Sequence, residues 1–147
     1  MAAGLSIRKE NLESFAERFE AAVCQRTTPE DFIPETRVDL ELPLDAVNDL
    51  LLADLEQMEP HGAGNPESIF LARDVVVQST RIVGENHLRL FLRQGQRALS
   101  AIAFGMADQA VETGSKLDVL FTPEENEWNG SKSVQLRIRD MRPTRGA

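Results

Sequence analysis

The apolar positions near the start of the chain recur at intervals of three and four residues. From about Asn11 to Gln25 this spacing predicts an amphipathic helix, with Asn11 as its N-cap. Cys24 lies on this helix without a nearby histidine, so we expect a small packed residue rather than a nucleophile. Ahead of the helix, Gly4–Ile7 has the pattern of the end of a strand. A chain that begins within a strand indicates a piece of a longer protein.

A short strand and a second helix are predicted before residue 60. Residues 27–34 contain two prolines and are expected to form a linker. Val38–Leu42 alternates between apolar and polar residues, which predicts a strand. Apolar positions at helical spacing then predict a helix from Asp45, its expected cap, to about Met58. The proline- and glycine-rich residues 60–66 cannot continue that helix and mark the predicted domain boundary.

After Glu67 the pattern changes to alternating runs that predict five strands. They are Ile69–Val83, His87–Arg93, Ala98–Phe104, Leu117–Phe121 and a fifth strand with Val134, Leu136 and Ile138 facing inward. A helix over Met106–Glu112 is predicted between the third and fourth strands, and Trp128-Asn129-Gly130 has the composition of a turn. This order is that of an OB-fold barrel. An SH3-like barrel lacks the helix, and a sandwich usually needs about seven strands.

Composition and charge narrow the class of protein. The 147 residues include one cysteine, so no internal disulfide can form. No apolar run reaches the roughly 18 residues of a membrane span, and the start lacks the features of a signal peptide, so we expect a cytoplasmic protein. The net charge of −8 is divided unevenly, because residues 1–66 hold 5 basic and 14 acidic side chains whereas residues 67–147 hold 11 and 10. The nearly neutral half can still carry a basic face.

No motif indicates a complete catalytic or metal site. Gly62-Ala63-Gly64 lacks the preceding strand and the further glycine of a dinucleotide site, so a tight turn is the better interpretation. His61 has no second histidine or cysteine at ligand spacing. Glu124, Glu125 and Glu127 are better explained as a solvated acidic loop than as a cation site. We therefore predict no catalytic residue and no metal ligand in this chain.

The strongest local signal is the outward side of the second predicted strand. Phe91 lies there among the polar side chains of His87, Arg89 and Arg93. An exposed ring can stack on a base while guanidinium groups contact phosphates. Alternatively, Phe91 packs beneath the N-terminal segment and the arginines only solvate the sheet; the residues alone leave both open. Trp128, at a loop tip, can likewise stack on a base or close the barrel end.

The set of residues predicted to contact nucleic acid combines this strand with nearby basic and aromatic positions. OB-fold barrels bind single-stranded nucleic acid or sugars on the outer face of their second and third strands and on adjoining loops. The predicted set is Arg81, His87, Arg89, Phe91, Arg93, Trp128, Lys132, Arg137 and Arg139.

Several segments form ordered motifs. Pro60–Glu67 resembles the P-F-G-x-G-N-P-E segment of the RecJ family of bacterial single-stranded-DNA-specific exonucleases, with His61 in place of the usual phenylalanine. Met1–Gly4 resembles the end of the G-G-H-x-x-A-A-G motif in the DHH-associated domain, although the Gly-Gly-His part is absent. The segments similar to the family's OB domain are His87–Leu90, Ala101–Gly105, Phe121–Gly130 and Leu136–Pro143.

The resemblance implies the C-terminal piece of a RecJ-like 5′-to-3′ exonuclease that acts in DNA repair and recombination. It implies a mostly β fold, a five-stranded OB-fold barrel preceded by two helices from the end of an α/β domain. Residues 1–36 would be the end of the DHH-associated domain with a linker, residues 37–66 a connecting strand-helix segment, and residues 67–147 the OB domain. The DHH domain, whose Asp and His ligands would hold Mn²⁺ or Mg²⁺, is absent from the sequence. We therefore expect binding of single-stranded DNA, without catalysis and without a cofactor in this fragment.

The competing hypothesis is a protein-interaction module. In that case the barrel docks a partner such as single-stranded-DNA-binding protein, or buries its groove against the acidic helical segment. A third possibility is recognition of RNA or an oligosaccharide by the OB fold. Phosphate contacts give an affinity that falls steeply with salt, whereas an apolar protein interface changes little.

Overall fold

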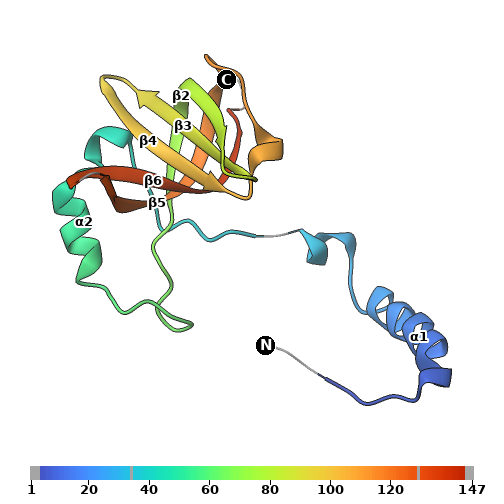
Figure 1. Cartoon of the computed structure of the whole chain (residues 1–147). Coiled ribbons are helices and arrows are strands. Elements are labelled where there is room, and N and C mark those ends of the chain that lie inside the picture. Colours follow the sequence, from blue (N-terminus) through green and yellow to red (C-terminus); the bar gives the residue numbers. More distant parts are fainter. Residues whose placement is uncertain (1–3, 34, 129, 145–147) are drawn as a thin grey trace. The chain divides into compact units, whose positions relative to one another are not determined.

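The computed structural model describes residues 4–33, 35–128 and 130–144, and of Trp128 it describes the backbone only. The chain forms two compact units, Met1–Thr36 and Arg37–Ala147 (Figure 1). Residues 60–66 therefore lie inside the second unit, although the sequence pattern placed a boundary there. The motif at Met1–Gly4 and the predicted turn at Asn129 fall largely outside the described residues.

The first unit contains the predicted amphipathic helix. α1 spans Leu12–Cys24, within one residue of the expected bounds. Asn11 occupies the N-cap position, as predicted, but its side chain makes no capping hydrogen bond, and a 3-10 turn over Lys9–Asn11 leads into the helix. Cys24 is exposed, so the expectation of a packed cysteine is wrong for this unit. A second 3-10 turn, Pro29–Phe32, lies in the predicted linker.

A closed barrel of five strands forms the main part of the second unit (Figure 1). The strands pair in the order β2-β3-β4-β6-β5, and β5 returns to pair with β2. Neighbouring strands are antiparallel except for β4 and β6, which are parallel. This order is the OB-fold topology, so the predicted fold class is confirmed. The five strands are β2 (Phe70–Val83), β3 (His87–Gln94), β4 (Arg97–Phe104), β5 (Lys116–Trp128) and β6 (Ser131–Pro143).

The alternating pattern of each strand separates the core from the outer face. Leu88, Leu90 and Leu92 of β3 are at most 2% exposed, and Leu136 and Ile138 of β6 are also buried, as predicted. These residues share one core with inward side chains of the other strands.

The last two strands are longer than the sequence pattern indicated. β5 and β6 remain paired from Leu117 opposite Pro143 to Trp128 opposite Ser131. Glu124, Glu125 and Glu127 therefore lie on a strand, and the expectation of an acidic loop is wrong. Backbone pairing over this length overrides the low strand propensity of the acidic run.

The strand β2 bends at an irregularity within the half that pairs with β5. Its pairing with β5 shifts register between Ala72 and Val75, and Asp74 has a φ of 55° within that shift. The Asp74 N–H donates to a carboxylate oxygen of Asp118, which is 5% exposed, at 3.3 Å, and the Thr144 hydroxyl donates to the same oxygen at 3.0 Å. This buried carboxylate holds the bend, which lies just before β2 begins to pair with β3 at Val76.

Residues before the barrel complete its core at one end. β1 (Leu40–Glu41) pairs in parallel with the start of β2, and a 3-10 turn over Leu44–Ala46 follows. Leu44 and Val47 are completely buried in the barrel core. A hydrogen bond also joins this segment to the barrel, because the Arg97 guanidinium donates to the Val47 carbonyl at 3.0 Å.

The second helix begins later than predicted. α2 spans Asp49–Glu56, and its cap is Asn48, whose side-chain oxygen accepts a hydrogen bond from the Leu51 N–H at 3.0 Å. Asp45 lies instead in the 3-10 turn that carries Leu44 into the core. With 13 residues in α1 and 8 in α2, no described helix is long and apolar enough to cross a membrane.

The connection between β4 and β5 contains one 3-10 turn, Ala107–Gln109, rather than the helix predicted over 106–112. Its later part is held against β2 by the backbone. The Gly114 N–H donates to the Val77 carbonyl at 2.7 Å, and the Val77 N–H donates to the Ser115 carbonyl at 3.0 Å. Met106 and Val111 both pack against the core, whereas on a helix residues five apart point about 140° away from each other.

The tight turn predicted at residues 62–64 is confirmed. The Gly62 N–H donates to the Asn65 carbonyl at 2.8 Å, and the Asn65 N–H donates back to the Gly62 carbonyl at 3.0 Å. The Asn65 side chain also donates to the Met58 carbonyl at 2.7 Å, which anchors the turn to the end of the α2 segment.

Shortening Leu44 tests whether the residues before the barrel belong to its core. We expect Leu44→Ala to lower the free energy of unfolding by about 2–5 kcal/mol, because it leaves a cavity in a packed interior. Leu50→Ala is the matched control, since Leu50 is on α2 but 78% exposed, and it should change the value by about 0.5 kcal/mol or less. Denaturant unfolding of both variants measures the difference. Equal stabilities would contradict a shared core.

Candidate nucleic-acid interface

A row of arginines crosses the outer face of the barrel. Arg89 points outward from β3, because its neighbours Leu88 and Leu90 are in the core. The register places Arg81 of β2 opposite Arg89. On its other side Arg89 faces Ile102 of β4, which in turn is opposite Arg137 of β6. Because neighbouring strands are about 4.8 Å apart, this arginine row (Arg81, Arg89 and Arg137) spans about 14 Å.

The charges of the arginine row are not neutralised within the described residues. No ion pair joins any of its three members to a described carboxylate. Arg81 and Arg89 are directly opposite each other, an arrangement of like charges that destabilises a sheet. An anion bound across the row would remove this repulsion. The row therefore has the charge and spacing of a phosphate-binding surface.

Two phenylalanine rings lie on either side of the arginine row. Phe91, two residues along β3 from Arg89, is opposite Ser100 of β4 and is 40% exposed. Phe104, at the end of β4, is 52% exposed. The guanidinium carbon of Arg137 lies over the Phe104 ring, 5.9 Å from its centre. Exposed rings beside unpaired arginines can stack on bases while phosphates contact the cations.

Phe104 was missed by the sequence-based prediction. It was assigned to the third strand without a direction, although alternation with Ile102 on the same strand places it on the outer face. His87, which was predicted, is its cross-strand neighbour, and the two rings meet edge to face at 5.1 Å. His87 Nδ1 also accepts a hydrogen bond from the Gly105 N–H at 3.2 Å. The contact and the hydrogen bond hold both rings on the outer face.

Three other predicted residues lie away from the arginine row or have partners of their own. Arg93 is on the same face near the other end of β3, and donates to the Gly95 carbonyl at 3.0 Å. Arg139 forms an ion pair with Glu67. Lys132 is paired with Glu125 at 2.7 Å, and this hydrogen bond raises the pKa of Lys132.

The structure thus separates the residues that were predicted to contact nucleic acid into those near the arginine row and those elsewhere. Arg139 and Lys132 are less available to a ligand than the arginine row because each would have to leave a carboxylate. The side chain of Trp128 lies outside the described part of the chain. The residues brought together in or beside the arginine row are Arg81, His87, Arg89, Phe91 and Arg137, with Phe104 in addition.

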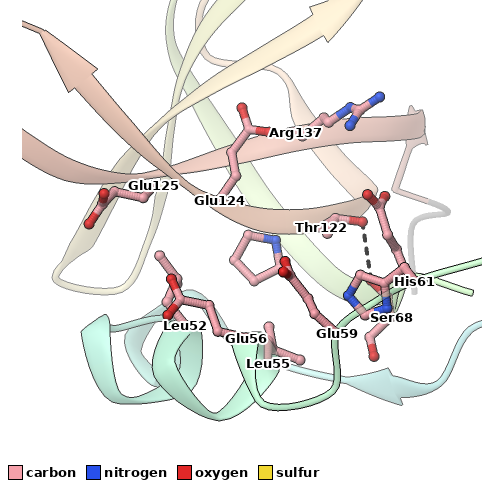
Figure 2. Close-up of a pocket in the computed structure, with 12 residues that line it drawn as sticks. Leu52, Leu55, Glu56, Glu59, His61, Ser68, Thr122, Glu124, Glu125 and Arg137 are labelled. Atoms are coloured by element: carbon pink, nitrogen blue, oxygen red, sulfur yellow. Dashed lines mark hydrogen bonds between the residues drawn. The ribbon is translucent and has the colours of Figure 1, made fainter. Parts of the chain in front are cut away.

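An acidic pocket borders the arginine row. It has a volume of about 190 Å³ and lies between α2 and β5, with Glu56 and Glu59 on the α2 side and Glu124 and Arg137 on the barrel side (Figure 2). The Glu124 carboxylate accepts a hydrogen bond from the Gln135 amide at 3.0 Å. Residues 37–147 hold 12 basic and 17 acidic side chains, so the cationic face is a local feature of an acidic unit.

A closed five-stranded barrel with this topology defines an OB-fold domain. The sequence model of the RecJ OB domain matches residues 38–140, and the chain belongs to that family. It is 28% identical to the single-stranded-DNA-specific exonuclease RecJ of Bacillus subtilis and 32% identical to that of Dickeya dadantii, over 95% and 97% of this chain. The resemblance seen in the sequence motifs is therefore confirmed.

A solved structure shows the same fold. The crystal structure of RecJ from Thermus thermophilus in complex with Mn²⁺ superimposes with a TM-score of 0.76 and 25% identity over 96% of this chain. The chain spans 20% of that structure, and 18% and 25% of the Bacillus and Dickeya proteins.

The described residues do not form a cluster that fits a metal ion. Thermus RecJ has been solved with Mn²⁺ and with Mg²⁺. Within residues 4–33, 35–128 and 130–144, no three His, Cys, Asp or Glu side chains are grouped so that they could hold an ion.

Removing one charge of the facing arginine pair should stabilise the free protein. We expect Arg81→Gln to raise the free energy of unfolding by about 0.2–1 kcal/mol, because the repulsion with Arg89 is relieved. The gain should shrink at high salt, where exposed charges are screened. Lys116→Gln is the control, since Lys116 is an exposed cation of the barrel that lies opposite Val76 rather than a like charge. Thermal unfolding at low and high salt measures both, and a loss of stability in Arg81→Gln would contradict the repulsion.

Proposed function

We propose that this chain is the single-stranded-DNA-binding portion of a RecJ-like 5′-to-3′ exonuclease acting in DNA repair and recombination. The observation that carries the proposal is the unpaired arginine row with Phe91 and Phe104 on either side. The hydrolytic step and its Mn²⁺ or Mg²⁺ ions are assigned to a part of the protein outside this chain. The proposal places the protein in the cytoplasm.

The arginine row binds the sugar-phosphate backbone. Guanidinium groups suit phosphate recognition because they are planar, always charged and able to donate two parallel hydrogen bonds. Arg81, Arg89 and Arg137 cross four strands nearly at right angles to the strand direction. A single strand that follows the row crosses the same face that other OB-fold proteins use, on which about 4–16 nucleotides are bound.

The rings bind bases without selecting a sequence. Every base has a π face, so stacking on Phe91 or Phe104 tolerates any sequence. Bases must be unpaired to stack in this way, which favours single strands over a duplex. This combination suits an enzyme that processes DNA ends of any sequence.

The acidic remainder of the unit confines DNA to the cationic face. Glutamates line the pocket beyond Arg137, so a phosphate that moved past the arginine row would meet negative charge. Because exposed charges are screened beyond about 8 Å at physiological salt, the attraction of the row is short-ranged. Binding should therefore depend steeply on salt.

Replacing Arg89 tests the phosphate contacts. We expect Arg89→Ala to weaken binding to single-stranded DNA of any sequence and to reduce the slope of log affinity against log salt by about one unit. Arg26→Ala is the control, because it makes the same change in net charge on the first unit. Fluorescence anisotropy with a labelled oligonucleotide over a salt series gives both quantities.

The same salt series also tests the competing function, a protein-interaction module. A parent chain that does not bind DNA, or binds it with no salt dependence, would contradict the proposal. Salt-independent capture of single-stranded-DNA-binding protein would instead support a protein-interaction module.

Replacing Phe91 tests stacking. We expect Phe91→Ala to weaken binding by about 1–3 kcal/mol with an unchanged salt slope, since stacking releases no counterions. Phe32→Ala is the matched control, because Phe32 is 64% exposed and lies in the first unit. Melting temperature and affinity are measured on the same samples. Lost stability with unchanged affinity would show that Phe91 is a packing residue.

A further inference from the structure

We propose that Arg137 and Phe104 form a base clamp, in which one base of the bound strand inserts between the guanidinium group and the ring. The proposal rests on the proposed DNA-binding function and adds a distinct role for one member of the arginine row. Arg137 then contacts a base, whereas Arg81 and Arg89 contact phosphates.

The distance between the two groups is the first observation. The guanidinium carbon is 5.9 Å from the centre of the Phe104 ring. Flat groups in direct contact are about 3.5 Å apart, so a base between the two groups needs planes about 7 Å apart. The guanidinium group already lies over the ring, so a movement of the Arg137 side chain away from the ring would make room for a base.

Arg137 is free to make this movement. It is in no ion pair with a described carboxylate, although it lines a pocket with several glutamates (Figure 2). Glu124, which lines the same pocket, is instead hydrogen-bonded to Gln135 at 3.0 Å. The Glu124 carboxylate therefore already has a hydrogen-bond partner other than Arg137.

The ring of Phe104 is held in place and is still about half exposed. His87 meets it edge to face, at 5.1 Å and an interplanar angle of 75°. The hydrogen bond from the Gly105 N–H to Nδ1 fixes the His87 ring in turn. Phe104 nevertheless remains 52% exposed. A ring that is already oriented loses little conformational freedom when a base stacks on it.

Arginine is suited to the outer half of the clamp. Its guanidinium group is planar and stacks on aromatic faces, whereas the ammonium group of lysine is a compact point charge. The other two members of the row differ, because within the described residues neither Arg81 nor Arg89 has an aromatic ring beneath it. A point charge can replace them at a phosphate more readily than it can replace Arg137 at a base.

The decisive comparison is between two arginine-to-lysine variants. We expect Arg137→Lys to weaken binding to an oligothymidylate of about 16 nucleotides by about 5-fold or more relative to the parent, with the salt slope unchanged because the charge is kept. The loss should clearly exceed that of Arg89→Lys. Equal losses in the two variants, with the parent still binding DNA, would overturn the clamp and leave the proposed function intact. A parent that binds no DNA would refute both.

Phe104→Leu tests the other half of the clamp. Leucine keeps the apolar contact with the sheet but has no flat π face, so we expect a loss similar to that of Arg137→Lys. Phe32→Leu, at an exposed phenylalanine of the first unit, should bind like the parent. Melting temperatures confirm that each variant is folded.

An oligonucleotide without bases distinguishes stacking on a base from an effect of Phe104 on the shape of the outer face. On an abasic sugar-phosphate oligonucleotide of the same length, the parent, Arg137→Lys and Phe104→Leu should bind equally, because no base is present to be clamped. A Phe104→Leu variant that loses as much affinity on the abasic strand would show that the ring shapes the face without stacking, and would overturn the proposal.

Discussion

Closure of the barrel depends on β2, which pairs with β5 as well as with β3. The first half of β2 pairs with β5 and its second half with β3, and Val76 pairs with both. A bend within the half that pairs with β5 places Asp74 at a positive φ, which costs conformational energy for a residue other than glycine. The buried carboxylate of Asp118 receives the Asp74 N–H, and Arg73 and Arg142 lie 3.5 and 3.7 Å from it. These contacts compensate the buried charge, so that one carboxylate stabilises the bend.

The candidate interface depends on the parallel pairing of β4 with β6. This pairing sets Arg137 beside Ile102. The arginine row and the contact of Arg137 with Phe104 therefore join residues more than 30 positions apart in the sequence. Without the β4–β6 pairing, Arg81 and Arg89 would stay opposite each other on β2 and β3 but would be separated from Arg137.

The second unit carries its pocket carboxylates and its unpaired arginines on neighbouring parts of its surface. Acidic side chains from α2 and β5 surround the pocket, and the unpaired arginines lie on the strands next to it. The cations Arg139 and Lys132 form ion pairs with Glu67 and Glu125, respectively. The net charge of the unit is thus a poor guide to its ligand, because the field that a phosphate meets is set by nearby charges within a screening length.

Local pattern by itself determined the inward and outward faces of β3, the helix α1 and the OB-fold order, because alternation and helical spacing follow from backbone geometry. It also placed Arg89 and Phe91 on the outer face. The sequence could not assign the start of α2 at Asp49 or the 3-10 turn in place of the helix at 106–112, because burial of Leu44 and packing of both Met106 and Val111 against the core decide them. Nor could it separate unpaired from paired arginines or reveal Phe104 as a partner of Arg137. Those facts depend on register between distant strands, which only the closed tertiary structure fixes.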